Sequence, residues 1–335
     1  MAKIEVDYAK CLALARHIEL LGGVPPDRED PMPYTFPASV AENGWCATVA
    51  INHQTTPVVG TPLRGTVRGK FLRGWDYLLQ KSILEANRNS EMYTVAWFLS
   101  VTPAMLCDIF RDENEGETLT GVEGRAEILN SLGRFLRENN WNGVRGAYLV
   151  SDGYIMRNDG LGLAQLFSRT CGYADPVQKK LFYFLALMHN QGFWEYRDIF
   201  NLSSPVNYHE QRGHFRLGTV KILDAELERK ILNRENIDAE EDVEIRFAVR
   251  HAIEFVAGAL NVAPSAMHYF FWNYFRNCCG RDAAHCASCG DNCRLPERYR
   301  PQNTAACILA PACKSAGIHI SEMLIEPRLD DTIWQ

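Results

Sequence analysis

Residues 205–218 read PVNYHEQRGHFRLG, and this stretch carries the most informative pattern in the chain. After a Pro-Val turn comes Asn207, a residue type that caps helices because its side-chain oxygen accepts a hydrogen bond from the first turn. His209, Arg212 and Arg216 then recur at spacings of three and four, so they share one face of the predicted helix. A helix N-terminus carries partial positive charge and orders the side chain at its cap. The stretch therefore predicts a short helix beginning at an ordered Asn207, with an ordinary capped surface helix as the alternative.

Composition indicates a globular protein. The chain has 335 residues, 47% hydrophobic and 23% charged, with a net charge of −6. Its first twenty residues carry charges throughout, unlike a secretion signal. No stretch approaches the roughly 18 apolar residues of a membrane span, so we expect a cytoplasmic protein without a membrane partner. The net charge does not indicate a nucleic-acid binder, although basic residues between 276 and 314 form a local patch that either contacts phosphates or is simply solvated.

Most of the chain has helical periodicity. Apolar residues at helical spacing predict helices over 75–87, 121–140, 161–171, 177–191, 225–234, 244–260 and 268–277. Thr102 followed by Pro103 predicts another helix start. Residues 3–22 also predict a helix, whereas 34–70 mix β-branched residues with turn formers and predict a small strand-containing segment. We therefore expect a mostly α fold in three parts: an N-terminal helix and β element at 1–70, a helical domain at 71–277, and a Cys-rich segment at 278–335.

Two lysines begin another predicted helix in DPVQKK, residues 175–180. A turn before a helix exposes backbone N–H groups, which suit a phosphate. A lysine in the first turn can contact that phosphate or, if desolvated, attack a carbonyl-like carbon. Lys179 and Lys180 are candidates for either role, and a solvated helix end is the alternative.

Seven of the eleven cysteines lie between residues 278 and 313. Clustered cysteines in a cytoplasmic chain favour a metal site over disulfides. The spacing C-x6-C-x2-C-x3-C suits a four-iron–four-sulfur cluster or zinc, and an all-thiolate set predicts a structural role. The residues of this run are Cys279, Cys286, Cys289 and Cys293. Three cysteines stand outside it: Cys278, Cys307 and Cys313.

Together these features resemble the helix-hairpin-helix DNA glycosylases of the endonuclease III superfamily. There a hairpin presents a lysine, a V-D-x-H-x-x-R-x-x-x-R-x-G segment presents a catalytic aspartate at a helix cap, and C-x6-C-x2-C-x5-C holds an iron–sulfur cluster. This chain matches over about residues 160–295, with Asn207 at the aspartate position and a shorter last cysteine spacing. The resemblance implies a helix-hairpin-helix glycosylase-like fold and favours Lys180 as the hairpin lysine.

A wider resemblance is to the queuosine-salvage N-glycosylases, which release the base from a queuosine nucleotide and share the glycosylase-like helical fold. It is carried by RGKFLRGWDYLLQKSILEA, SVTPAMLCDIFR, GRAEILNSLGRFL, VNYHEQRGHFRLGTV, DVEIR and HYFFW. That family has an aspartate at the position of Asn207 and, in our alignment, another at His268. It does not end in a cysteine cluster, and its alignment favours Lys179 over Lys180.

The amide at Asn207 raises a chemical question. Cleavage of an N-glycosidic bond builds positive charge on the sugar, which a carboxylate stabilises, and losing one such group costs about 100- to 1000-fold in rate. Three explanations are open. Asp198 or Glu210 has taken over the role, the amide suffices for an activated leaving group, or Asn207 replaces a natural aspartate.

The base must leave its stack before cleavage, so the pocket should hold it between aromatic rings. Trp75 is favoured because it follows Gly74 at the entry to a helix, and a core position is the alternative for each aromatic residue. The expected substrate-binding residues are Trp75, Tyr208, His209, Arg212, His268 and Trp272. Two further aromatic candidates are Trp97 and Tyr269.

We therefore expect a monomeric hydrolase that cleaves the N-glycosidic bond of a modified base in DNA, for example hypermodified phage DNA in antiviral defence. One alternative is a queuosine 5′-monophosphate N-glycosylase. Another is a catalytically inactive nucleic-acid-binding protein, for which the amide at Asn207 is the main indication.

Overall fold

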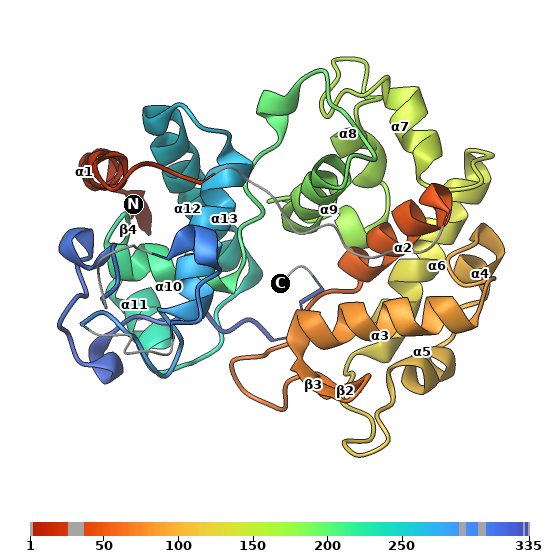
Figure 1. The fold of residues 1–335 in the computed structure, drawn as a ribbon, viewed down its shortest axis with the longest axis horizontal. Helices are drawn as coiled ribbons and strands as arrows, with labels where there is room; N and C mark the ends of the chain where they lie inside the picture. Colours follow the sequence, from red (N-terminus) through yellow and green to blue (C-terminus); the bar gives the residue numbers. More distant parts are fainter. Residues whose placement is uncertain (1–2, 26–36, 288–292, 301–305, 331, 334–335) are drawn as a thin grey trace. The chain divides into compact units, whose positions relative to one another are not determined.

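The computed structural model describes residues 3–25, 37–287, 293–300, 306–330 and 332–333. Within these ranges the chain is mostly helical, as expected, with thirteen α-helices and two two-stranded sheets. It divides into two compact units (Figure 1). The first comprises the described parts of Met1–Arg28 and Leu202–Asp330, and the second those of Glu29–Asn201 and Asp331–Gln335. These boundaries differ from the expected divisions at residues 70 and 277.

Three helices form the centre of the first unit: α10 (Tyr208–Leu217), α12 (Ala239–Leu260) and α13 (Pro264–Asn277). Each packs against the other two, and α1 (Tyr8–Leu20) lies along α12. Eight consecutive residues of α10, from Glu210 onward, are buried. The helix that carries the key sequence pattern is therefore enclosed by its own unit, rather than lying on the surface.

Strand β1 (Ile4–Val6) pairs antiparallel with β4 (Val220–Ile222), and α11 (Ala225–Leu232) follows β4. The predicted helix over 3–22 is therefore wrong at its beginning. Asp7 ends the strand and caps α1, because its Oδ1 accepts a hydrogen bond of 2.8 Å from the Lys10 N–H. The strand depends on a partner more than 200 residues later in the chain, so no local pattern indicates it.

The second unit contains α2 (Ala38–Ala50) where the sequence predicted strands, so that prediction is wrong for these residues. All ten residues from Ala41 to Ala50 are buried. A helix enclosed on every side lacks the alternation of apolar and polar faces by which helices are recognised in a sequence. The predicted β element is nevertheless present further on, as a hairpin of β2 (Arg64–Val67) and β3 (Lys70–Arg73).

Helix α2 contacts α3, α6 and α9 among the seven other helices in the described part of this unit. They are α3 (Gly74–Arg88), α4 (Val95–Ser100), α5 (Pro103–Phe110), α6 (Val122–Glu138), α7 (Arg145–Ser151), α8 (Leu163–Phe167) and α9 (Lys179–Asn190). The predicted start of α5 is confirmed, since Thr102 Oγ1 accepts from the Met105 N–H at 3.2 Å and Pro103 is its first residue. Helices α4 and α7 were not predicted, and both are too short for a clear period.

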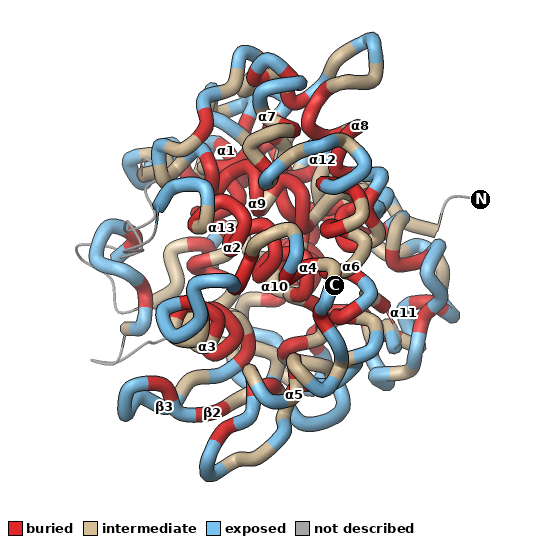
Figure 2. Tube along the Cα trace, turned by 90° about the vertical axis from the view of Figure 1, so that its right-hand side faces the viewer, coloured by how far each residue is buried: buried red, intermediate tan, exposed pale blue. Residues whose placement is uncertain are grey.

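Buried residues run along α9 and α10, while the β2–β3 hairpin is largely exposed or half-buried (Figure 2). No helix in the described ranges combines the length and the apolar character needed to cross a membrane.

Candidate functional site

The N-terminus of α10 is built as the sequence predicts. Asn207 has extended backbone geometry, and its Oδ1 accepts a hydrogen bond of 2.7 Å from the His209 N–H. In return, Glu210 Oε2 accepts a hydrogen bond of 2.8 Å from the Asn207 N–H. This reciprocal pair is a capping box, which satisfies two N–H groups that the helix itself leaves without partners. The Asn207 side chain is thus held in one orientation while the residue is only half-buried.

A carboxylate and an imidazole lie directly behind this cap. Glu210 Oε1 contacts His268 Nδ1, and the side chains are 0% and 3% exposed. His268 comes from α13, so packing of α13 on α10 brings together two residues far apart in the sequence. The sequence had indicated each separately, Glu210 as a substitute carboxylate and His268 as an aligned aspartate position. Their pairing was not predicted.

The shared face of His209, Arg212 and Arg216 exists, but its two arginines are buried. Arg212 forms an ion pair of 2.7 Å with Glu326 and donates to the Cys279 carbonyl at 2.8 Å. His209 Nδ1 lies 2.8 Å from Arg212 Nη2. Arg212 therefore links α10 to the cysteine segment at Cys279 and to Glu326 in the last described part of this unit's chain.

Two aromatic candidates of this unit are half-buried. The ring of Tyr208 lies 4.1 Å from that of His209, and the Arg276 guanidinium lies 4.8 Å from the Trp272 ring. Tyr269 is only 3% exposed and packs edge-on against His268. Tyr208 is thus the aromatic residue next to the Asn207 cap.

The predicted lysines lie in the second unit, at the start of α9. The turn before them is held by Asp175, whose carboxylate accepts from the Val177 and Lys179 N–H groups at 3.1 and 3.0 Å. Lys179 is half-buried, whereas Lys180 is 1% exposed. Lys180 Nζ donates to the Ala50 carbonyl at the end of α2. The two lysines therefore have different surroundings, which the sequence could not distinguish.

The end of α2 gathers three basic side chains. Lys180 Nζ lies 3.4 Å from His53 Nδ1, and Arg125 donates to the carbonyls of Ile51 and His53. Burial, with the charges of Lys179 and Arg125, holds the pKa of Lys180 well below its ordinary value. Burial, with Lys180 and Arg125, likewise lowers the pKa of His53. Carbonyl groups at a helix C-terminus attract such donors, so this arrangement stabilises the α2 end.

The remaining candidates of the second unit have structural contacts. Trp75 is half-buried, with its ring stacked 6.4 Å from Trp45 and edge-on 5.4 Å from Tyr183. Trp97 is 6% exposed within the core. The carboxylate of Asp198 accepts from the N–H groups of Ile155 and Met156 at 2.7 and 3.0 Å. Both oxygens of Asp198 thus hold a loop of the second unit, whereas Glu210 lies next to Asn207 at the start of α10.

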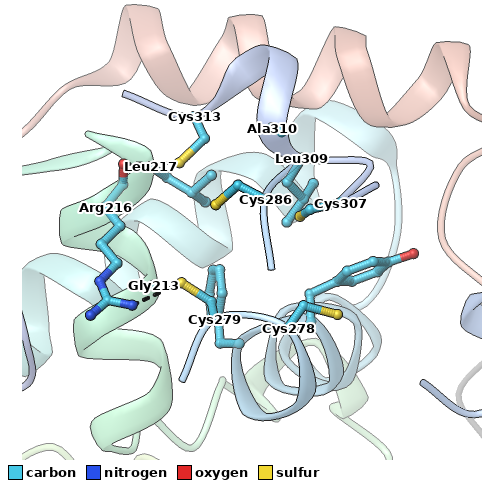
Figure 3. Close-up of a pocket in the computed structure, with 12 residues that line it drawn as sticks. Gly213, Arg216, Leu217, Cys278, Cys279, Cys286, Cys307, Leu309, Ala310 and Cys313 are labelled. Atoms are coloured by element: carbon cyan, nitrogen blue, oxygen red, sulfur yellow. Dashed lines mark hydrogen bonds between the residues drawn. The ribbon is translucent and has the colours of Figure 1, made fainter. Parts of the chain in front are cut away.

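Among the predicted metal ligands, Cys289 lies outside the described residues. Cys279 and Cys286 line a cavity in the first unit, beside the end of α10, together with the three cysteines outside the predicted run, Cys278, Cys307 and Cys313 (Figure 3). Cys293 is not among the residues lining it. Within the described ranges, no group of three or more His, Cys, Asp or Glu side chains is placed to hold a metal ion.

No family model and no curated protein matches the chain.

Proposed function

We propose that the chain is an N-glycosidase that hydrolyses the bond between a modified base and its sugar in DNA. The observation that carries this proposal is the position of Asn207. It stands half-buried at the N-cap of α10, where its Oδ1 accepts from the His209 N–H and its own N–H donates to Glu210. The glycosylases that the sequence resembles use the cap of the equivalent helix for the catalytic group.

Glu210 best explains how an amide can occupy that position. Its carboxylate is fully buried, so it cannot touch the sugar itself. It lies one hydrogen bond from the Asn207 backbone, however, and a negative charge at this distance in a low-dielectric surrounding favours the positive charge that develops on the sugar. We assign Glu210 a positioning and electrostatic role, with His268 holding its second oxygen.

Lys179 is the better candidate for contact with a phosphate. It is half-buried at the first position of α9, whereas the Lys180 amine is used by the Ala50 carbonyl inside the unit. We therefore propose hydrolysis without a covalent lysine intermediate.

A second candidate is a hydrolase of queuosine 5′-monophosphate. It is favoured by the distribution of the segments that resemble the queuosine-salvage enzymes. These segments fall on α3, α5, α6, α10, α12 and α13, and so cover both units. The DNA glycosylase resemblance covers a smaller part of the chain.

The test is base release, measured by mass spectrometry, from DNA with modified bases and from queuosine 5′-monophosphate. Three chains are compared: the unchanged chain, Asn207→Asp and Asn207→Ser. All three residues are good N-caps, so helix stability is matched. We expect release from DNA, faster by about 100- to 1000-fold with aspartate and lower with serine.

Base release from queuosine 5′-monophosphate but not from DNA would show that the second candidate is correct and that the proposal is wrong. If neither the unchanged chain nor Asn207→Asp releases a base while both bind DNA, the chain is an inactive nucleic-acid-binding protein and the proposal fails.

A further inference from the structure

Four cysteines from two separate segments face one cavity beside the C-terminal end of α10. Cys279 and Cys286 come from the segment after α13, and Cys307 and Cys313 from the segment round the short 3-10 helix Ala310–Ala312. Figure 3 shows the sulfurs of Cys286, Cys307 and Cys313 along one side of this space and that of Cys279 across from them, beside Arg216. The sulfur of Cys278, which also lines the cavity, points away. We propose that Cys279, Cys286, Cys307 and Cys313 are the ligands of an iron–sulfur cluster.

A hydrogen bond to sulfur supports this assignment. Arg216 Nη1 donates to Cys279 Sγ at 3.3 Å. N–H donors stabilise thiolates and are the usual surroundings of sulfur bound to a metal.

The cavity also favours a cluster over a single ion. Twelve residues line it, including the apolar side chains of Leu217, Phe275 and Leu309. A zinc ion needs four sulfurs about 2.3 Å from one point, and within the described ranges no three such side chains are placed around a single ion. In a cluster each cysteine binds a different iron, so the sulfurs stand further apart.

Hydrogen bonds already hold both segments in place. The Cys307 N–H donates to the Cys286 carbonyl at 3.3 Å, which joins the two cysteine segments. The thiol of Cys313 donates to the Arg216 carbonyl at 3.2 Å, and the Ser315 N–H to the same carbonyl at 3.0 Å. When the cluster is inserted, each thiol releases its proton to solvent and its sulfur binds one iron, while the incoming cluster supplies iron and sulfide. The cluster thus stabilises the C-terminal end of α10, and this structural role does not depend on the proposed hydrolysis.

The experiment is anaerobic purification of the full chain after expression with added iron, followed by absorbance near 400 nm (roughly the position of thiolate–iron charge transfer) and assays of iron and acid-labile sulfide. Single serine substitutions at the four proposed ligands are compared with Cys278→Ser and Cys293→Ser as matched controls. We expect each ligand substitution to remove the absorbance and most of the iron, and both controls to keep them.

Alkylation of the unchanged protein gives a measurement that does not depend on how the variants fold. We expect Cys307 and Cys313 to be protected from iodoacetamide in the loaded protein, and to react after the iron is chelated, while Cys293 reacts in both states. The ligand set is wrong if Cys293 is protected while Cys307 and Cys313 react. Zinc without sulfide would overturn the cluster.

Discussion

Gly213 in α10 lies directly against the ring of Phe275 in α13, so closely that a Cβ at residue 213 would be 2.3 Å from the ring carbons. The ring has little room to move, because it stacks in parallel on Phe271 at 5.4 Å. The only side chain that fits between the two helices here is the hydrogen of glycine. This close approach brings α13, with His268, against the helix that Asn207 caps.

Gly213→Ala should therefore destabilise the protein, although alanine is normally the better helix residue. We expect a loss of about 1–3 kcal/mol, the usual cost of forcing extra volume into a packed core. Gly258→Ala in α12 is the matched control, because nothing lies within 4 Å of its added Cβ; there we expect a gain of about 0.5–1 kcal/mol. Urea denaturation of both variants tests this, and equal effects would contradict the close packing.

Glu210 should contribute to stability mainly through the capping box and its contact with His268. Glu210→Gln keeps an acceptor for the Asn207 N–H, whereas Glu210→Ala removes it and leaves the buried His268 without this partner. We expect alanine to cost about 2–3 kcal/mol and glutamine clearly less. Under the proposed function, glutamine should slow base release nonetheless. Full activity of Glu210→Gln would exclude an electrostatic role for the carboxylate.

His214 should make the protein sensitive to mild acid. It is fully buried, with Nδ1 2.7 Å from Thr219 Oγ1, and burial lowers its pKa to about 3. Below an unfolded-state pKa of about 6.5, the unfolded chain takes up a proton that the folded chain does not. The free energy of unfolding therefore decreases by about 1.4 kcal/mol, from this group, for each unit by which the pH is lowered. His214→Gln should flatten the profile between pH 6.5 and 4. Parallel profiles for the two proteins would show that the buried imidazole does not control the acid response.

Lys180 should behave as a structural residue. Burial holds its pKa well below the ordinary value, so from that pKa up to about 10.4 the unfolded chain binds one proton more than the folded chain, and this residue's contribution to stability rises with pH. Lys180→Met should remove this pH dependence but leave base release within a few-fold of the unchanged chain. Lys179→Met should instead weaken DNA binding. Trapping of a lysine–substrate adduct by borohydride, abolished in Lys180→Met, would show that Lys180 is the nucleophile.

Several features could be predicted from the sequence because their signals are local. The caps at Asn207 and Thr102 were predicted correctly, since both depend on residues within one helical turn. The capping box of α12, Asp238 with Glu241, is also a local signal, and it places the start of the helix at residue 239, before the predicted start at residue 244.

Long-range packing decided the rest. The sequence by itself determined a mostly helical chain, the capped start of α10 and a cluster of cysteines near the C-terminal end. Only the tertiary structure paired Ile4–Val6 with Val220–Ile222, enclosed α2, set Glu210 against His268, and brought Cys307 and Cys313 to the same cavity as Cys279. Caps and amphipathic periods are properties of a few neighbouring residues. Burial and contact between distant segments depend on which faces meet once the helices pack, and no local pattern records that.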